Sequence, residues 1–171
     1  MIHIISGDGR GKTTSAAGLA VRAAGAGMRV AFFQFMKDGS SSEITVLRSV
    51  NGITVRCCEV CRRFIWEMDE REKEAVVKEQ DLMLKEAKAL ISDEAVDMLV
   101  LDEFFSAYNT GTADKSLAED IVLNCPESTE LVLTGRDPAE VFCAAADYHS
   151  EIRSVKHPYD RGVSARKGIE Y

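Results

Sequence analysis

The segment from Ser6 to Thr14 constrains the fold of this chain more than any other stretch. It reads S-G-D-G-R-G-K-T-T, and it follows a short apolar run containing Ile2, Ile4 and Ile5 and precedes an alanine-rich segment of helical character. Strand, glycine loop and helix in this order form the setting of a phosphate-binding loop. The strict pattern G-x-x-x-x-G-K-[ST] has glycine where this chain has Ser6. The G-K-T-T sequence after a strand nevertheless disfavours a chance glycine turn.

The residue types of this loop suit a bound nucleotide. Three glycines leave room for backbone N–H groups to turn toward an anion, and the following helix adds the positive end of its dipole. Lys12 supplies a mobile positive charge, and Thr13 supplies a hydroxyl for Mg²⁺. The predicted nucleotide-binding residues are Gly7, Asp8, Gly9, Arg10, Gly11, Lys12, Thr13 and Thr14, together with Arg136, which follows a later strand.

Length and charge limit the class of protein. The 171 residues suit one domain spanning positions 1–171, and the net charge of −7 disfavours general attraction to nucleic acid or to an anionic membrane. The apolar runs are too short to span a membrane, and the N-terminus starts directly on a strand without a charged leader. We expect a cytoplasmic protein with no nucleic-acid or membrane partner.

Five cysteines, an odd number, are most simply reduced thiols in such a protein. Their one cluster is Cys57-Cys58-x-x-Cys61. A single C-x-x-C pair without a second pair or a nearby histidine is a weak indication of a metal or redox site. We therefore favour packing of Cys57 and Cys58 as small apolar side chains at the end of a strand, and the metal or redox alternative stays open.

Strand and helix patterns alternate along the chain and predict an α/β fold of the P-loop NTPase-like (RecA-like) class, with a mainly parallel sheet and helices on both faces. Polar residues 37–42 are predicted to form a loop at the ligand-binding edge of that sheet, and residues 62–66 another loop. The predicted strands are 2–5, 30–36, 53–57, 96–103, 130–136 and 151–155, and the predicted helices are 13–26, 67–91, 115–123 and 138–146.

The strand at 96–103 ends in two acidic residues, Asp102 and Glu103. A P-loop fold uses such a strand to bring a carboxylate to Mg²⁺, and we expect it beside the first strand. Because successive strand side chains point in opposite directions, the two carboxylates cannot both face the metal in the same manner. General P-loop reasoning favours Asp102 as the metal ligand.

The sequence lacks the usual signs of a catalytic nucleophile. None of its three histidines stands in a recognisable constellation with a nucleophile and base, and no arginine-rich lid of a nucleotide kinase is present. The nucleophile is therefore expected to come from the substrate.

Five motifs together resemble the ATP:corrinoid adenosyltransferases of the CobA/BtuR type. The similarity extends over essentially the whole chain, and members of that family also depart from the strict loop pattern at the place of Ser6. Longer relatives have an N-terminal extension that helps cover the active site, whereas here Met1 already begins the first strand. The motifs are G-D-G-R-G-K-T-T, F-x-W-E at 64–67, V-L-D-E at 100–103, T-G-R at 134–136 and the ending V-K-H-P-Y-D-R-G-V-S-A-R-K-G-I-E-Y.

The resemblance implies a specific reaction. A Co(I) corrinoid attacks the 5′ carbon of the ribose of ATP, a cobalt–carbon bond forms, and tripolyphosphate leaves; the strong nucleophile belongs to the corrinoid. It also implies that Lys12 and the loop hold the phosphates in reversed orientation, and that Thr13 and Glu103 hold Mg²⁺. Asp102 remains the alternative from general reasoning. A homodimer and an electron-donating flavoprotein reductase are the implied partners.

Phe64 and Trp66 have two interpretations. Aromatic packing alone would make them a core staple in front of the long helix. The resemblance implies that they press on the lower face of the corrin, exclude an axial ligand and produce a four-coordinate Co(II) that is easier to reduce. For the whole chain, the alternatives to an adenosyltransferase are a P-loop kinase or ATPase acting on a small molecule and a non-catalytic sensor that binds both ligands.

Overall fold

The computed structural model describes residues 1–169 and contains one six-stranded sheet with the order β3-β2-β4-β5-β1-β6. All of its strand pairings are parallel, and the predicted α/β class is confirmed. The strands are β1 (Ile2–Ser6), β2 (Val30–Gln34), β3 (Ile53–Cys57), β4 (Met98–Asp102), β5 (Glu130–Gly135) and β6 (Tyr148–Glu151).

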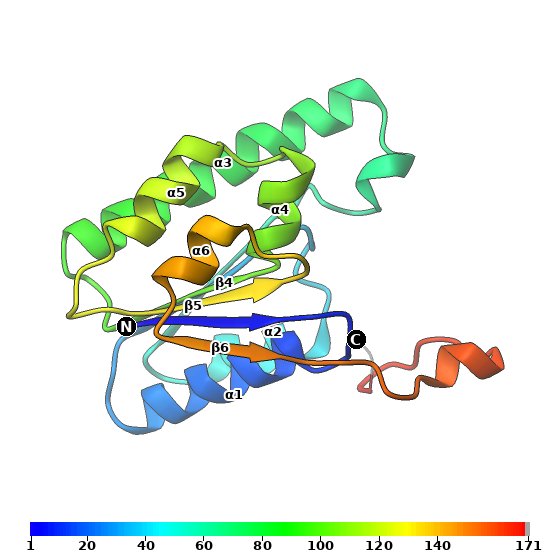
Figure 1. Ribbon diagram of the computed structural model, residues 1–171, viewed down its shortest axis with the longest axis horizontal. Coiled ribbons are helices and arrows are strands. Elements are labelled where there is room, and N and C mark those ends of the chain that lie inside the picture. The colour runs from blue at the N-terminus through cyan, green and yellow to red at the C-terminus, as the bar shows by residue number, and fades with distance from the viewer. Residues whose placement is uncertain (170–171) are drawn as a thin grey trace.

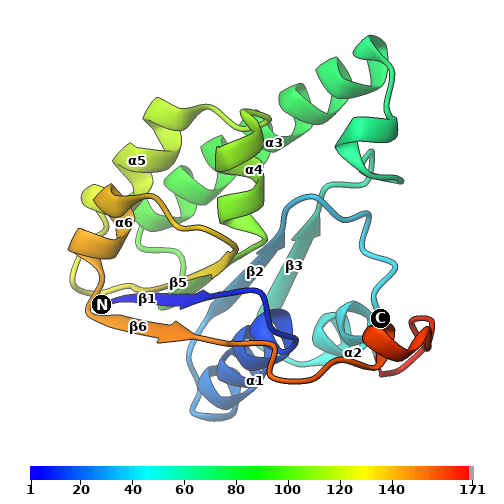
Figure 2. The ribbon, with the colours of Figure 1, turned by 45° about the vertical axis from the view of Figure 1, so that its right-hand side comes forward.

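Helices cover both faces of the sheet. Helices α1 and α2 lie on one face, and α3 to α6 lie on the other (Figure 1, Figure 2). Within residues 1–169, no helix combines the length and apolar character needed to cross a membrane. The helices are α1 (Lys12–Gly25), α2 (Ser42–Ser49), α3 (Glu70–Ser92), α4 (Phe104–Thr110), α5 (Lys115–Leu123) and α6 (Glu140–Ala145), with two short 3₁₀ helices, η1 (Ile65–Glu67) and η2 (Pro158–Arg161).

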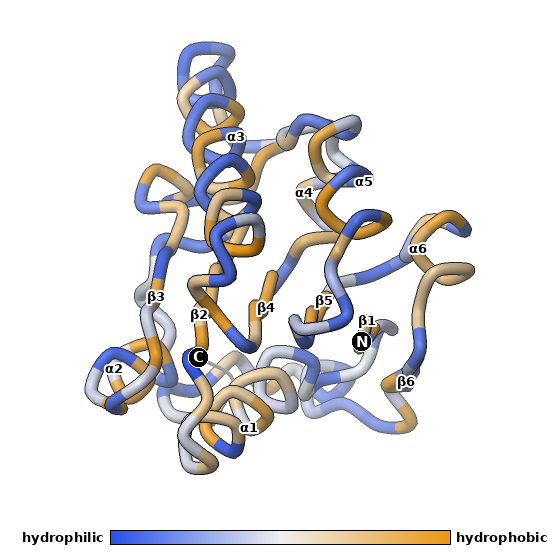
Figure 3. The backbone as a smooth tube through the Cα atoms, turned by 90° about the vertical axis from the view of Figure 1, so that its left-hand side faces the viewer, coloured by the Kyte–Doolittle hydropathy of each residue, from blue (hydrophilic) through white to orange (hydrophobic). Residues whose placement is uncertain are grey.

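The central strands are apolar on both faces, which is why they read as unbroken apolar runs. In β4, Leu99 and Leu101 join the core under α3 to α6, whereas Val100 joins the core against α1 and α2. Figure 3 shows the same hydrophobic character in β2, β4 and β5. Two hydrophobic cores, one on each face, thus hold the strands in position. The carboxyl ends of these strands form the ligand-binding edge.

The last strand was predicted incorrectly. It was expected at 151–155 but spans Tyr148–Glu151, and all four of its residues are exposed. Because β6 lies at the sheet edge and pairs with β1 through its backbone, it has no apolar run to mark it. Of the predicted strand, only Glu151 belongs to β6, and residues 152–155 follow the strand as the chain leaves the sheet.

Two helices were not predicted. Helix α2 follows the polar loop and buries only Ile44 and Leu47, and α4 begins immediately after β4 without any turn residue in the sequence. Glu103 makes that sharp junction with a left-handed backbone, φ 57°. Helix α3 starts at Glu70 rather than at 67 because Asp69 caps it: its side chain accepts from the Glu72 backbone N–H, and the Glu72 side chain accepts from the Asp69 N–H.

We expected the strand that carries the acidic residues to lie beside the first strand, and this expectation was wrong. β5 is hydrogen-bonded between β4 and β1. Thr134 therefore lies near the carboxyl end of the strand that separates β1, which leads into the phosphate-binding loop, from β4, which ends in Asp102. This interposed strand contributes a residue to the site described next.

Candidate functional site

Lys12 lies at the centre of the glycine loop. It is the first residue of α1, and its Nζ donates to the carbonyl oxygen of Gly9 at 3.0 Å. The side chain is buried, and this burial lowers the pKa of Lys12; Arg136 lowers the pKa further, while Glu103 and Asp102 oppose the shift. The loop therefore holds a lysine whose charge has little contact with water, which suits it to an anionic ligand.

The segment after β6 shapes the loop from outside. Ile152 N donates to Ser6 O and Ile152 O accepts from Gly9 N, both at 2.8 Å. A Cβ on Gly7, which has φ 111°, would lie 2.3 Å from Ile152 O, and a Cβ on Gly9 would lie 2.7 Å from the carbonyl carbon of Arg153. Two of the loop glycines are thus required by a close approach of backbone to backbone, a constraint that the loop sequence alone does not reveal.

Three other predicted loop residues lie around this junction. The carboxylate of Asp8 accepts from Ser154 N at 3.2 Å, and Arg10 donates to the carbonyl of Ile169 at 3.5 Å. Thr14 is exposed on the first turn of α1. Asp8 and Arg10 therefore connect the loop to the C-terminal segment. Residues 170 and 171, which end the family-like G-I-E-Y motif, lie outside the described residues.

Asp102 is fully buried and accepts three side-chain hydrogen bonds. Thr134 donates to one carboxylate oxygen at 2.7 Å, and Thr13 and Gln34 donate to the other at 3.2 and 3.1 Å. The ammonium of Lys37 lies 3.9 Å from the second oxygen. The carboxylate thereby ties the loop threonine to three strands of the sheet.

Glu103 lies just beyond β4, where its left-handed backbone turns the chain into α4, and its side chain has different partners from that of Asp102. Its backbone N–H donates to Thr134 Oγ1 at 2.9 Å, and its carboxylate accepts from Ser106 Oγ at 2.7 Å. Unlike Asp102, it is only partly buried and lines a pocket. The two acidic residues at this strand end therefore occupy different environments.

The donor set at this edge fits a Mg²⁺ ion. Thr13 and the two carboxylates offer only oxygen, which Mg²⁺ prefers, and the side-chain oxygen of Gln34 is buried without a hydrogen-bond partner. Among residues 1–169, no three or more His, Cys, Asp or Glu side chains are grouped to hold a metal. Oxygen ligands from a threonine and one or two carboxylates suit Mg²⁺, an ion that keeps water and takes further ligands from phosphates.

One pocket of about 530 Å³ joins this edge to the aromatic pair. Phe64 and Trp66 stack on each other with centroids 4.5 Å apart and planes within 6°, and they are 62% and 77% exposed. Exposure of this extent is incompatible with the core-staple interpretation. The other residues that line the pocket are Met36, Lys37, Cys61, Arg63, Ile65, Glu103, Ser106, Asn109, Thr110, Arg136 and Asp137.

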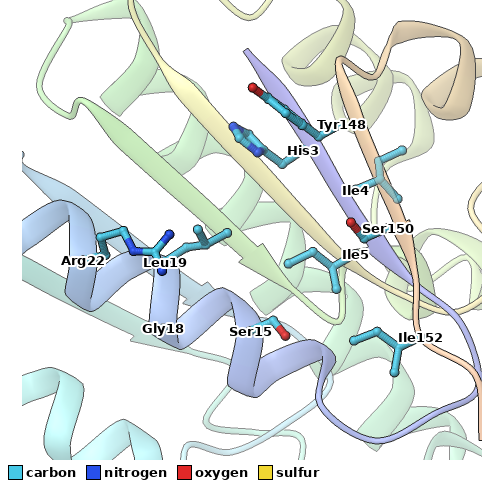
Figure 4. A pocket seen from close by; sticks show the side chains of 10 residues that line it. All are labelled: His3, Ile4, Ile5, Ser15, Gly18, Leu19, Arg22, Tyr148, Ser150 and Ile152. Atoms are coloured by element: carbon cyan, nitrogen blue, oxygen red, sulfur yellow. The ribbon is translucent and has the colours of Figure 1, made fainter.

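A second pocket of about 540 Å³ lies between α1 and the β1–β6 edge (Figure 4). His3 stacks on Tyr148 there, with centroids 4.7 Å apart, and its Nε2 lies 2.6 Å from a carboxylate oxygen of Glu130. None of the predicted site residues lines it. The similar volume therefore does not make it the candidate functional site.

Sequence reasoning missed several residues of the site. Lys37, Gln34 and Thr134 all lie at or just beyond the carboxyl ends of parallel strands, as Asp102 does. The same strand-end argument could have identified them. Ile152 could not have been identified in this way, because its contribution comes from its backbone.

Fold and site together define a P-loop nucleotide-binding protein of the α/β class with an aromatic-lined pocket beside the phosphate loop. A solved structure with the same overall fold is the KaiC-like protein PH0186 of Pyrococcus horikoshii OT3, with a TM-score of 0.51, 14% identity, and coverage of 89% of this chain and 71% of that one. The chain matches the ATP:corrinoid adenosyltransferase BtuR/CobO/CobP family over residues 1–171, and it belongs to that family.

Relatives support this membership over their length. The corrinoid adenosyltransferase of Escherichia coli (strain K12) is 33% identical over 176 residues, which cover all of this chain and 85% of the relative. Corrinoid adenosyltransferase CobA of Salmonella typhimurium and the corrinoid adenosyltransferase of Pseudomonas aeruginosa are each 32% identical, with 85% and 82% of their lengths covered. The predicted family is thereby confirmed.

Proposed function

We propose that this chain, as a single domain, transfers the 5′-deoxyadenosyl group of ATP to the Co(I) centre of a corrinoid and releases tripolyphosphate, in adenosylcobalamin biosynthesis or salvage. Membership of the adenosyltransferase family supports this function. The observation that carries it is the shared pocket, in which the exposed Phe64–Trp66 stack faces the same space as Glu103 and Arg136. A planar, largely apolar ring system and a charged phosphate chain would both find complementary groups there.

The protein's part in the reaction is alignment and charge neutralisation. Lys12 and the loop N–H groups hold the triphosphate, and Arg136 adds positive charge at the same edge. These charges stabilise the leaving group as the carbon–oxygen bond breaks, and holding both substrates in one pocket brings the cobalt close to the 5′ carbon. No protein side chain is required as the nucleophile, which accounts for the lack of a nucleophile and base constellation.

Mg²⁺ is part of this proposal. Thr13 supplies a hydroxyl ligand, and Glu103, which is partly exposed in the pocket, supplies a carboxylate. Asp102, whose oxygens already accept from Thr13, Gln34 and Thr134, would position Thr13 from beneath. Bound there, Mg²⁺ would supply further positive charge to the leaving triphosphate.

Phe64 and Trp66 are proposed to contact the lower face of the corrin and exclude the axial ligand of Co(II). Reduction to Co(I) requires an electron donor, for which a flavoprotein reductase is proposed. We also propose that the protein is a homodimer and acts in the cytoplasm. A P-loop kinase or ATPase is not favoured, because the family to which the chain belongs transfers the adenosyl group.

The decisive experiment is anaerobic incubation of the protein with ATP, Mg²⁺ and chemically reduced cobalamin. We expect the corrinoid spectrum to change to that of the adenosylated form, with one tripolyphosphate per corrinoid. Formation of ADP or free phosphate without adenosylated corrinoid would instead assign a kinase or ATPase. Binding of both ligands without turnover would assign a sensor.

A further inference from the structure

Cys58 and Cys61 form a close thiol pair beside the pocket that contains the aromatic stack. Their Sγ atoms are 2.7 Å apart, and both side chains are buried. Cys61 N donates to Cys58 O at 2.9 Å, so a tight turn holds the pair together. Of the two, Cys61 lines the pocket that contains Phe64 and Trp66.

The surroundings of the pair disfavour a metal ion. Two thiolates that each lie about 2.3 Å from one tetrahedral zinc ion are about 3.8 Å apart, well beyond the separation of these sulfurs. The amide of Gln80 also lies beside the pair, with its Nε2 3.9 Å from Cys58 Sγ and 3.7 Å from Cys61 Sγ. That nitrogen donates hydrogen bonds and does not bind metals.

We propose that Cys58 and Cys61 are a reversible redox modification site, at which a disulfide forms and alters the aromatic segment 62–68. Two S–H bonds break and one S–S bond forms. The two electrons and two protons pass to hydrogen peroxide, giving two waters, or to a small-molecule disulfide, giving two thiols. A dithiol reverses the step. The effect on corrinoid binding rests on the proposed function, whereas the disulfide itself does not.

The chemistry of the pair differs from that of the other thiols. The hydrogen bond between the two sulfurs lowers the pKa of Cys58, with a contribution from Gln80, although burial opposes it. Burial raises the pKa of Cys57 and of Cys125. The same hydrogen bond between the two sulfurs, together with burial, raises the pKa of Cys61, so Cys58 is the thiol of the pair that more readily forms the reactive thiolate. Cys57 packs in the opposite core, against the side of α1 and α2.

The pair is coupled to the aromatic stack through a short segment. Cys61 and Met68 are buried at its two ends, and the exposed Phe64 and Trp66 lie between them. Within it, Glu67 N donates to Phe64 O at 2.9 Å. A disulfide bond at Cys61 would therefore change the backbone only three residues before Phe64. Trp66 is the only tryptophan of the chain, so its fluorescence reports on this segment without any ligand.

The experiment exposes the full-length protein to hydrogen peroxide or to glutathione disulfide, blocks free thiols by alkylation and maps the peptides by mass spectrometry. We expect the Cys58–Cys61 peptide to lose the mass of two hydrogen atoms and to regain it with dithiothreitol. Trp66 emission should shift in parallel. Corrinoid affinity, measured by equilibrium dialysis, should fall at least about fivefold, as an ordinary coupling between sites would give, while ATP affinity stays unchanged.

Two variants make the test specific. Cys58→Ala should lose the mass change and the fluorescence shift, whereas Cys57→Ala, which removes the adjacent and equally buried thiol, should keep both. Should Cys58→Ala not fold, peptide mapping of the unmodified sequence still decides the question. Two free, alkylated thiols at 58 and 61 under conditions that oxidise Cys125 or Cys143 would overturn the site. A disulfide without change in Trp66 emission or corrinoid affinity would overturn its coupling to the pocket.

Discussion

The buried ammonium of Lys12 shows how a single residue defines the phosphate site. Its Nζ is held by a backbone carbonyl of the loop itself, and its pKa is lowered by burial. An anion entering the loop would restore a favourable environment for this charge. The positive charge is thus paired only weakly before the nucleotide arrives and strongly afterwards.

Replacing Lys12 with Ala is expected to reduce adenosylation on the order of a hundredfold or more, because a charge facing the leaving triphosphate is lost. Corrinoid binding should be retained. Steady-state kinetics at modest ATP concentrations check this, with Lys78→Ala, an exposed lysine on α3, as the matched control. Near-normal rates in the Lys12 variant would contradict the role of the loop.

Asp97 contributes to stability at the opposite end of the strands, where β2 and β4 begin. Its carboxylate accepts from the backbone N–H and from the guanidinium of Arg29, each at 2.7 Å, and joins the starts of β2 and β4. These bonds lower the pKa of Asp97 to about 2. Because the folded pKa is depressed, the stabilisation is present above the ordinary pKa of 3.8 and is lost as the pH falls toward 2.

We therefore expect Asp97→Asn to lower the melting temperature slightly near neutral pH. The difference from the unmodified protein should shrink as the pH falls below the ordinary aspartate pKa of 3.8. Thermal unfolding followed by circular dichroism across this range tests it. Asp93→Asn, an exposed aspartate at the end of α3, is the control and should have little effect at any pH. A constant difference between Asp97→Asn and the unmodified protein at all pH values would refute the explanation.

At the scale of elements, the glycines of α1 and of the loop before it differ in how well they would accept a side chain. A Cβ at Gly9 would overlap the backbone of Arg153, whereas a Cβ at Gly18, in the middle of α1, would meet nothing within 4 Å. Gly9 is needed for the approach of the C-terminal segment, and Gly18 only weakens its helix.

Gly9→Ala should therefore weaken ATP binding and lower stability, because the backbone of residues 152–153 must move. Gly18→Ala should raise stability by about 1 kcal/mol through helix propensity alone and leave ATP binding unchanged. Urea unfolding and ATP titration of both variants distinguish these effects. Equal behaviour of the two variants would show that the close approach at Gly9 is not required.

The segment around η1 contains Phe64 and Trp66, which are proposed to contact the corrinoid. Replacing both Phe64 and Trp66 with Ala should spare ATP binding and, since both rings are exposed, thermal stability as well. Adenosylation that starts from Co(II) and a weak reductant should fall far more than adenosylation of Co(I) prepared chemically. The electron paramagnetic resonance signal of four-coordinate Co(II) should vanish in the same variant.

The comparison of the two assays gives this prediction its control. Chemically prepared Co(I) bypasses the electron transfer that the aromatic pair is proposed to assist. A similar loss in both assays, together with a lower melting temperature, would contradict the proposed role of Phe64 and Trp66 in the reduction step.

For the whole molecule, the sequence predicted what local patterns encode. The buried strands β2, β4 and β5 were predictable because both of their faces are apolar. Short α2 and α4 were not, because they are stabilised by the elements on which they pack, and β6 was misplaced because an exposed edge strand has no apolar pattern. The loop and Asp102 were recognisable in sequence. Gln34 and Thr134 could have been proposed as strand-end residues, but their contact with Asp102 follows from the order of the strands, which no local pattern gives.

The contact between the loop and Ile152 has a consequence for biosynthesis. A ribosome makes the glycine loop well before residues 152 and 153, whose backbone groups lie against it. Contacts so distant in sequence form late in folding, because a long stretch of chain must be ordered before they are gained. A nascent chain that stops before residue 152 contains every residue of the phosphate loop and lacks its shape. We therefore expect a chain that ends before residue 152 to bind ATP more weakly than the full chain.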